Sequence, residues 1–534
     1  VPALAVPADE AHGLRVAAPP IGGVRRFVPR PVGAAVALIV WLGFSIGLHP
    51  LTLPDEGRYV GIAWEMMRSG DWLVPTQDGL PFFHKPPLFY WLTALSMEAF
   101  GVNVAAARLA PLLLSGLAML GLWAATRRRA GAAIANATMV VLATLPFFFA
   151  AADYANLDMP VAAWIALTIV FAADAALALR DGTPSRRKVV FAWACAALGV
   201  LAKGLIGIVL PGIVVVVWLL AMRKPRMILR LVSPLGIVVF VLIAAPWFLL
   251  VQERHPGFLH FFFVYQHFER FTASGFNNPQ PWWFFVVVLP GLTLPWSLWL
   301  VRARIPEGSN DSADRRSWRT LMWIWLAVVV AFFSFPQSKP VGYVMPALFP
   351  LAFLIAEPAL AAWRSQRTAA RRTVAATLGL AVAICLGALV FVATRYDRDL
   401  TALAHVLRDA RAPGDPVVFV QEYFFDVPLH ARLREPVPVI ADWHDPDIFK
   451  RDNWRRELAE AAPFAPERAA ALLVDAQRGF ALRCGNAPLW AIVKSTDEPI
   501  VAALADAKRV AAMHRAALWR IAPRACPAGE APPR

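Results

Sequence analysis

The chain is patterned as a series of long apolar runs separated by short polar connections. A helix needs about twenty residues to cross the ~30 Å hydrocarbon core of a bilayer. Apolar runs near that length recur through most of the chain, so the sequence predicts about eleven membrane-spanning helices. We expect these spans at residues 32–51, 104–126, 132–150, 158–179, 188–202, 204–222, 231–250, 281–301, 318–335, 341–362 and 373–394.

Composition supports an integral membrane protein, since hydrophobic residues make up 58% of the chain and 21 residues are tryptophan. The formal net charge of +15 would suggest a nucleic-acid partner in a soluble protein. Here the basic residues form short clusters between apolar runs, so orientation in the membrane explains them better. We therefore expect no nucleic-acid partner. Residues 1–31 are interpreted as a disordered cytoplasmic tail before a retained first span.

The basic clusters fix which side each connection faces. They fall on one side of the predicted topology, in the connections that contain Arg127–Arg129, Arg180 to Lys188, Arg223 to Arg230, Arg302 to Arg319 and Arg364 to Arg372. By the positive-inside rule that side is cytoplasmic. In this frame Pro86 to Gly101 cannot cross the membrane, so we expect a helix along the outer surface with Tyr90 and Trp91 at headgroup depth.

After the last span the pattern changes to short β-type runs and amphipathic helices. Residues 396–534 are therefore expected to form a small α/β domain on the external face. Strands are predicted at Pro416 to Val420, Pro436 to Ile440, Ala471 to Val474 and Trp490 to Val493, and a helix at Trp454 to Ala461. Cys484 and Cys526 both fall in this domain, where a disulfide between them is predicted. Cys195 and Cys385 lie within spans as core thiols.

Two external acids can be explained in two ways. Asp55 follows Pro54 and precedes an amphipathic run, and Asp158 stands just before a span, so each could simply cap a helix. Both also fall on the same face of the membrane beside several cations. Ionisable groups near lipid are costly unless they are partnered or used. Loops from separate spans that meet on one face would form a plausible active-site cavity.

The external cations favour an anionic ligand. Lys85 could snorkel from an interfacial helix. However, Lys203, Arg270 and Lys339 also lie at external span ends or loops, where the positive-inside rule disfavours them. Phosphate suits such a set, because arginine offers a fork and lysine a point charge. The alternative is headgroup binding without chemistry.

Other observations narrow the function. The sequence contains neither a P-loop nor a Rossmann glycine pattern, so no nucleotide site is predicted. The acids within spans, Asp174 and Glu357, lie toward cytoplasmic ends, which favours chemistry at one face over transport. His84, His260 and His267 lack close metal-ligand spacing, and a polar lining is the simpler interpretation. A carrier-lipid transporter and a lipid-binding scaffold remain as non-enzyme alternatives.

Six segments together carry a family resemblance. They are Leu53-Pro-Asp-Glu-Gly-Arg-Tyr59, His84-Lys-Pro-Pro87, Tyr154-Ala-Asn-Leu-Asp-Met-Pro160, Ala202-Lys-Gly-Leu205, His260 to Phe271 and Ser338-Lys-Pro-Val-Gly-Tyr-Val-Met-Pro346. In order and spacing they resemble bacterial membrane glycosyltransferases of the aminoarabinose transferase type, which are relatives of protein mannosyltransferases. The resemblance covers residues 32–395 and, more loosely, the α/β domain.

This resemblance implies a GT-C fold, an all-α polytopic membrane protein with about 11 to 13 transmembrane helices, juxtamembrane helices in a first periplasmic loop at 52–103, and a small C-terminal periplasmic α/β domain. It also implies a polyprenyl-phosphate-linked sugar donor, lipid A or another periplasmic glycan as acceptor, and an active site at the periplasmic face of the bacterial inner membrane. The expected sugar is 4-amino-4-deoxy-L-arabinose. Another hexose or amino sugar, placed on lipid A, core saccharide or protein, is the alternative.

The resemblance assigns roles to particular residues. Asp55 would be the principal catalytic carboxylate and Asp158 its partner, while Lys85, Arg270 and Tyr343 would contact the carrier phosphate. The remaining candidates for substrate or phosphate binding are Arg58, Tyr59, Glu56, Lys203 and Lys339. His84 stands where the family pattern leads us to expect an acid, which leaves the metal site and any cofactor open.

Overall fold

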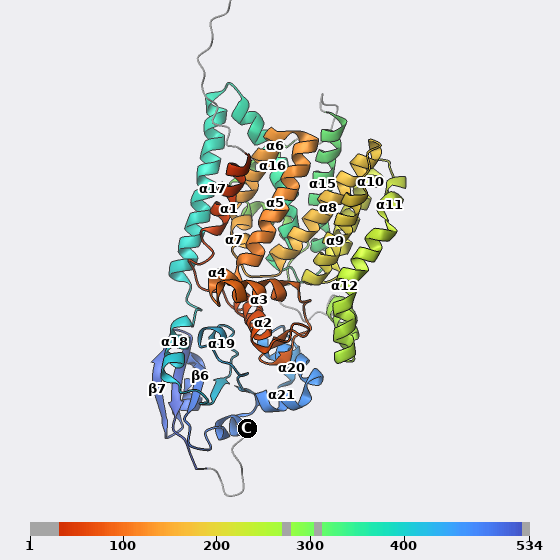
Figure 1. The fold of residues 1–534 in the computed structure, drawn as a ribbon. Coiled ribbons are helices and arrows are strands. Elements are labelled where there is room, and N and C mark those ends of the chain that lie inside the picture. The colour runs from red at the N-terminus through yellow and green to blue at the C-terminus, as the bar shows by residue number, and fades with distance from the viewer. Residues whose placement is uncertain (1–30, 270–278, 304–311, 526–534) are drawn as a thin grey trace, which may run out of the picture.

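The computed structural model describes residues 31–269, 279–303 and 312–525. Its first part is a bundle of helices that ends with one long helix on the outside of the bundle (Figure 1). The helices of the bundle are α1 (Pro31–Gly43), α5 (Leu109–Ala130), α6 (Ala132–Thr144), α7 (Pro146–Ala152), α8 (Asp158–Arg180), α9 (Arg186–Lys203), α10 (Ile206–Ala221), α11 (Arg226–Leu231), α12 (Pro234–Arg254), η1 (His260–Glu269), α14 (Phe284–Leu292), η2 (Trp296–Arg302), α15 (Ala313–Ser334), η3 (Val341–Ala347), α16 (Leu348–Arg364) and α17 (Thr368–Arg395).

Each apolar run predicted as a span contains a helix or a bent pair of helices. Within the described residues, six helices are long and apolar enough to cross a membrane, or up to eight if each of two bent pairs is one span. The predicted spans near 32–51, 188–202 and 204–222 correspond to α1, α9 and α10, which are not among those six. The multi-pass membrane architecture is confirmed.

The two bent pairs have a common cause in proline. Helices α6 and α7 meet at an angle of 72°, where Leu145 takes an extended conformation directly before Pro146. The second pair, α14 and η2, meets at 116° next to Pro295. Proline disfavours the helical conformation in the residue before it and cannot donate a backbone hydrogen bond. Each apolar run is therefore broken into two helices.

Burial sorts the helices into central and lipid-facing ones. The apolar window of α8 is 83% buried and that of the continuous stretch of η3 and α16 is 78% buried, whereas only 11% of the α17 window is buried. Helices α8 and α16 therefore form the middle of the bundle, and α17 presents most of its surface to the lipid.

The predicted cytoplasmic cations gather around two acids. The Asp174 carboxylate pairs with Arg128 at 2.8 Å, Arg129 at 2.7 Å and Lys188 at 2.8 Å. Glu357 pairs in the same way with Arg315 and Arg319. The two acids within spans thus have structural partners among the cations predicted for one side.

The first long connection contains α2 (Asp55–Ser69), the short hairpin of β1 (Thr76–Gln77) and β2 (Leu80–Pro81), α3 (Leu88–Phe100) and α4 (Val104–Ala107). Helices α2, α3 and α4 lie between the bundle and the C-terminal domain (Figure 1). The 13-residue α3 packs along α2, and Trp91 Nε1 donates a hydrogen bond to the Trp72 carbonyl oxygen at 2.7 Å. This segment does not form a span. Tyr90 corrects the prediction of headgroup contact, because it is fully buried beside Tyr59 and Phe82.

The C-terminal part contains a six-stranded sheet of order β5-β4-β3-β6-β8-β7. The strands β3 (Val417–Val420), β4 (Val439–Ile440), β5 (Leu473–Val474) and β6 (Leu489–Lys494) are parallel, and β7 (Ala507–Ala512) and β8 (Ala516–Ile521) form an antiparallel edge. The helices are α18 (Thr401–Ala410), α19 (Val427–His430), η4 (Pro446–Phe449), α20 (Trp454–Ala461), η5 (Ala462–Phe464), α21 (Pro466–Leu472), α22 (Ala476–Ala481), η6 (Ser495–Asp497) and α23 (Glu498–Ala502). The predicted α/β domain is confirmed.

The strand pattern follows from burial on both faces of the sheet. In β6, Trp490 and Ile492 pack into one core, and Ala491 and Val493 pack into the other. Central parallel strands covered on both faces are apolar throughout, which is why β3 and β6 were predictable. Strand β7 contains two consecutive basic residues, Lys508 and Arg509, and is largely exposed, so it has no continuous apolar run.

Two further links involve the C-terminal part. Cys484 is disulfide-bonded, Cys195 and Cys385 are free and buried, and Cys526 lies outside the described residues. Just after α17, the Tyr396 hydroxyl accepts a hydrogen bond from the Leu53 N–H and lies 3.3 Å from the Leu53 carbonyl oxygen. The start of the C-terminal part is therefore joined to the residue that precedes Pro54 and α2.

Candidate functional site

Asp55 is the first residue of α2 but does not cap it. Pro54 occupies the N-cap position, and no side chain makes a capping hydrogen bond there. The Asp55 side chain is 42% exposed, and its Oδ1 lies 3.5 Å from the Arg58 guanidinium one turn later in the helix. Asp55 is therefore not a helix cap, and its side chain is partly exposed and partly covered by the surrounding protein.

Asp158 is the first residue of α8 and also caps nothing. Its carboxylate forms an ion pair with the ammonium of Lys203, the last residue of α9. The Lys203 ammonium lies 4.5 Å from the centre of the Tyr343 ring, which belongs to η3. Three of the predicted residues, each from a different segment, therefore meet at one point.

Gly342 makes this meeting possible. A Cβ atom at position 342 would lie 2.7 Å from the carboxyl carbon of Asp158 and closer still to one carboxylate oxygen. Atoms do not approach so closely without displacement. The absence of a side chain at Gly342 lets η3 pack directly against the acid.

Asp55 lies within electrostatic reach of this group. Burial by the surrounding protein raises the pKa of the Asp55 carboxyl above its usual range, against the charge of Arg58, which lowers it. The charges of Asp158 and Lys203 act on the same carboxyl with opposite signs. The structure therefore brings the two predicted catalytic acids near each other and near a cation.

Arg58 links α2 to the C-terminal domain. Its Nε lies 3.1 Å from Glu457 Oε2 in α20, and its guanidinium lies 5.2 Å from the centre of the Phe425 ring. The neighbouring carboxylates hold the pKa of Arg58 above its usual value, despite burial, which lowers it. Arg58 is therefore a fixed cation with Asp55 on one side and Glu457 on the other.

Glu56 has a structural role. It is fully buried, and its two oxygens accept hydrogen bonds from Arg108 at 2.8 Å, from Thr52 at 2.8 Å and from the Ala155 N–H at 2.7 Å. These bonds hold the pKa of Glu56 below its usual range, against burial, which raises it. We predicted that Glu56 would contact substrate, and that interpretation is not supported because the carboxylate is occupied inside the protein.

Lys339 is likewise occupied. Only 3% of this residue is exposed, and its ammonium donates to the Gln280 carbonyl at 2.8 Å, to the Pro336 carbonyl and to the Gln337 carbonyl at 3.5 Å. Backbone carbonyls satisfy all three of its donors. Lys339 fastens two loops together, and its predicted phosphate contact is not supported.

Two predicted residues near the juxtamembrane hairpin are held differently. Tyr59 is buried against Phe89 and Tyr90, where burial raises its pKa well above the usual range. Lys85 is half-buried directly after His84, whose Nε2 lies 3.3 Å from Glu460 Oε2 in α20. The predicted phosphate contact of Arg270 falls outside the described residues, as does the side chain of His267.

Sequence reasoning missed three residues of this region. Arg108 is fully buried and bonds the backbone carbonyls of Ile46, His49 and Pro50 as well as Glu56. Tyr154 lies close enough to Asp55 for that charge to raise its pKa, in addition to the larger effect of burial. Tyr154 was part of a quoted motif, which was a usable signal. Glu457 is about four hundred residues away from Arg58 in sequence and gave none.

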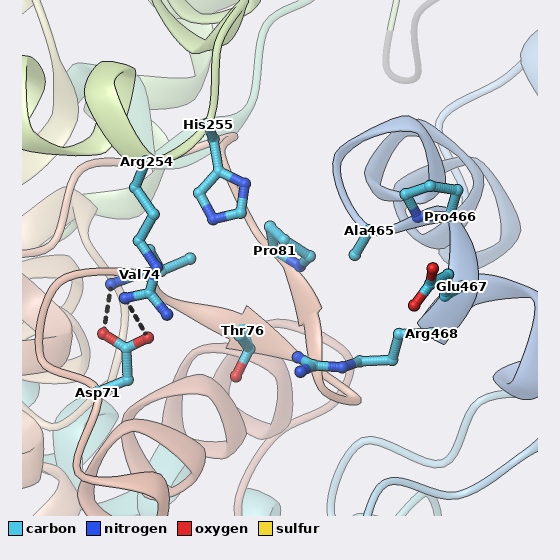
Figure 2. Close-up of a pocket in the computed structure, with 10 residues that line it drawn as sticks. All are labelled: Asp71, Val74, Thr76, Pro81, Arg254, His255, Ala465, Pro466, Glu467 and Arg468. Carbon is cyan, nitrogen blue, oxygen red and sulfur yellow. Dashed lines mark hydrogen bonds and ion pairs between the residues drawn. The ribbon is translucent and has the colours of Figure 1, made fainter.

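A separate cavity of about 410 Å³ lies between the juxtamembrane hairpin, the end of α12 and α21. Figure 2 shows Arg254 paired with Asp71 on one side of it, at 2.7 Å, and Glu467 and Arg468 on the other. None of its lining residues is a predicted site residue. We therefore place the candidate site at Asp55 and Asp158. Among the described residues, no group of three or more His, Cys, Asp or Glu side chains could hold a metal ion.

Comparisons with known proteins agree with the motifs. A family model described as dolichyl-phosphate-mannose-protein mannosyltransferase matches residues 84–249. Two curated relatives are undecaprenyl phosphate-alpha-4-amino-4-deoxy-L-arabinose arabinosyl transferases. The protein from Aeromonas salmonicida is 33% identical over 351 residues, and that from Pseudomonas paraeruginosa is 32% identical over 370 residues. Each alignment covers 65% of this chain and 62% of the relative, so the chain spans about three fifths of their length.

A solved structure matches over almost its whole length. It is the crystal structure of ArnT from Cupriavidus metallidurans bound to undecaprenyl phosphate. The TM-score is 0.77 at 25% sequence identity, and the match covers 93% of this chain and 99% of that chain. The GT-C fold expected from the motifs, with its C-terminal α/β domain, is confirmed.

Proposed function

We propose that this protein, whose resemblance to membrane glycosyltransferases of the aminoarabinose transferase type is confirmed by these comparisons, is an inverting glycosyltransferase. It transfers 4-amino-4-deoxy-L-arabinose from undecaprenyl phosphate to a phosphate of lipid A. The observation that carries the proposal is the grouping of Asp55 with Asp158, Lys203 and Tyr343 on one face of a fold that matches ArnT.

Asp55 is the proposed catalytic carboxylate. Displacement at an anomeric carbon passes through an oxocarbenium-like transition state, which a nearby carboxylate stabilises. The Asp55 carboxylate suits this role because it caps no helix and is exposed on one side. The attacking acceptor oxygen forms the new bond to the anomeric carbon as the bond to the carrier phosphate breaks, and the electron pair leaves with the carrier phosphate. An acceptor that is already a phosphate anion needs no general base.

The proposed leaving-group site consists of two cations and a phenol that come from separate segments. Lys85, Arg270 and Tyr343 contact the carrier phosphate in this proposal, as the resemblance implies. Lys203 already neutralises Asp158, so this pair serves to hold Tyr343 in place. Fixed donors of this kind can lower a barrier by about 3 to 4 kcal/mol each, because they are oriented before the charge develops.

The proposed setting is the bacterial inner membrane with the site facing the periplasm. A lipid-linked donor is suited to that side, where the activated bond must arrive with its carrier. In this proposal residues 1–31 are a cytoplasmic tail, 32–395 form the catalytic membrane part and 396–534 form the periplasmic domain. The site and the C-terminal domain lie on the same face of the bundle, which supports this arrangement (Figure 1).

The test is transfer by the purified protein in lipid vesicles that contain lipid A and the aminoarabinose donor. Mass spectrometry of the lipid A reads the added sugar directly, and a gain that matches one aminoarabinose is the expected result. The same assay with a hexose-linked carrier separates the alternative sugar. Movement of the carrier lipid between leaflets without any mass added to lipid A would refute the transferase and favour a transporter.

A further inference from the structure

Helix α20 of the C-terminal domain brings two acids to the candidate site, in addition to the contact of Phe425 with Arg58. Helix α20 carries Glu457 and Glu460 three residues apart, on one face of the helix. Glu457 lies 3.1 Å from Arg58, and Glu460 lies 3.3 Å from His84, which precedes Lys85. Two acids of a soluble domain thus meet two residues that flank the proposed sugar and phosphate positions.

The rest of α20 is held firmly, so the position of Glu457 is well defined. The Asn453 side chain caps the helix by accepting from the Arg456 N–H at 3.1 Å. Arg456 is buried and donates to Glu460 at 2.6 Å and to the Tyr265 hydroxyl at 2.8 Å. Tyr265 also donates to Glu460 at 2.7 Å. This network connects α20 to η1 and prevents it from moving freely over the site.

Glu457 also has a simpler explanation. It lies in the first turn of α20, where an acid interacts favourably with the helix dipole. That explanation accounts for the residue type but not for its contact with Arg58. The side chains of Arg58 and Glu457 are only 15% and 16% exposed, so water screens the pair weakly. A largely buried cation that lies between two carboxylates attracts both of them, so each carboxylate affects how strongly the cation acts on the other.

We infer that Glu457 is a positioning residue for the reaction, which holds Arg58 beside the Asp55 carboxylate and limits how strongly Arg58 neutralises it. This inference rests on the proposed function and deepens it, because it makes the C-terminal domain part of the catalytic apparatus. Without the Glu457 charge, Arg58 acts more strongly on Asp55. The carboxylate then holds its proton less tightly and is also less available to a developing cation.

The groups that act on Asp55 determine what a pH profile can report. From α2 they are Glu56, Arg58 and Tyr59, from α8 Asp158, from α9 Lys203, and from the connection before α8 Tyr154. A substitution at position 457 leaves these side chains unchanged, but the Glu457 charge acts on two of them, Arg58 and Tyr59. A shift in the acid limb of the profile on changing Glu457 therefore reports its effect through these two groups, and an Arg58→Gln background isolates the part that passes through Arg58.

The experiment compares Glu457→Gln with Asp445→Asn as a matched control. Asp445 pairs at 3.0 Å with Arg455, which belongs to α20 like Glu457, and it does not pair with Arg58. Glu457→Gln should lower kcat about tenfold and move the acid limb of the pH profile to lower pH. The control should stay within twofold of the wild type with an unchanged limb. Glu457→Asp, which keeps the charge, should retain the limb of the wild type.

A double mutant identifies the route of the effect. In an Arg58→Gln background, adding Glu457→Gln should change kcat less than twofold, because the residue through which Glu457 acts is gone. A full tenfold further loss in that background would overturn the inference. An unchanged limb and a kcat within twofold of wild type for Glu457→Gln alone would overturn it as well.

A second readout does not depend on sugar transfer. Dicyclohexylcarbodiimide labels protonated carboxyls, and peptide mass spectrometry gives its rate at Asp55 as a function of pH. Labelling should slow in Glu457→Gln at a pH where the wild type reacts, with Asp55→Asn as the blank. If the wild type transfers no aminoarabinose but Asp55 is labelled more slowly in Glu457→Gln than in the wild type, the proposed function fails and the positioning role stands. Identical labelling profiles would overturn the positioning role whatever the activity.

Discussion

The Lys203 ammonium pairs with the Asp158 carboxylate and lies 4.5 Å from the centre of the Tyr343 ring. The two charged side chains are 15% and 13% exposed, so each largely depends on the other for neutralisation. Asp158 is therefore not a free second acid beside Asp55. It is one half of a pair that joins α8 to α9 and supports Tyr343.

Removing one member of this ion pair should lower the free energy of unfolding more than removing both members. Asp158→Asn or Lys203→Met alone should lower the free energy of unfolding by about 2 to 4 kcal/mol, because each leaves a largely buried charge without its partner. The double variant should recover part of that loss. Unfolding curves in detergent measure all three variants. Strictly additive losses would show that the two side chains do not interact.

Gly342→Ala should damage the site without broad unfolding. The new methyl group would overlap the Asp158 carboxyl, so either that acid or η3 must shift. We expect kcat to fall about tenfold, as a displacement of about 1 Å at a site can cost more than that. Gly379→Ala in α17 is the control. No atom lies within 4 Å of its Cβ position, and it should keep full activity and gain about 0.5 to 1 kcal/mol of stability.

Asp55→Asn should fold and insert normally but lose transfer. The substitution keeps the shape of a partly exposed side chain and removes the charge proposed to face the transition state. We expect kcat to fall by about two to three orders of magnitude. Asp71→Asn, in the same loop and paired with Arg254, should leave kcat unchanged. Near-normal turnover by the Asp55 variant would remove this residue from the mechanism.

Glu56→Gln should affect stability first. Glu56 and Arg108 have no exposed side-chain surface, so neutralising Glu56 leaves the buried Arg108 cation with the more distant Asp153 carboxylate, 4.0 Å away. A loss of about 3 to 5 kcal/mol in the free energy of unfolding is expected. Thermal unfolding in detergent measures the loss. A stable variant that had lost only activity would instead restore Glu56 as a substrate contact.

Asp426 should make stability depend on pH. Burial raises the pKa of its carboxyl from 3.8 to about 7, although the Leu400 N–H, which donates to it at 2.9 Å, lowers it. The folded state therefore holds this proton more tightly than the unfolded state. Its contribution to stability is fully present below about pH 4 and is lost as pH rises to about 7.

Asp426→Asn removes this titration and provides the test. Its stability relative to the wild type should be smallest near pH 4 and should increase as pH rises toward 7. Chemical unfolding at several pH values measures the difference. A difference that is the same at pH 4 and pH 7 would show that Asp426 does not titrate in this range.

Much of the membrane part could be predicted because two strong physical signals run along the sequence. Apolar length located the helices, and the sidedness of basic clusters separated the Asp174 cluster from the group around Asp158. Single residues in short motifs then identified Asp55, Lys203 and Tyr343. The structure brings them together in one group.

What could not be predicted depends on contacts between distant segments. Glu56 and Lys339 have the same residue types as ligand-binding groups, and only their buried partners show that they are structural. Tyr90 was predicted at the membrane surface because tyrosine and tryptophan are typical of the membrane interface, and the same residue types also pack inside a protein. Glu457 meets Arg58 only because the C-terminal α/β domain packs against the first long connection.

The hydrogen bonds between the Tyr396 hydroxyl and the Leu53 backbone connect the two ends of the membrane part. Tyr396 follows α17, the last helix of the bundle, and Leu53 lies at the start of the first long connection. A protein truncated just before Tyr396 would lose this hydroxyl and its contact with Leu53, which lies two residues before Asp55. A cut just after it would still remove the domain that carries Glu457. The helical bundle and the C-terminal domain are therefore structurally linked, and we expect that neither part alone would reproduce the activity of the whole protein.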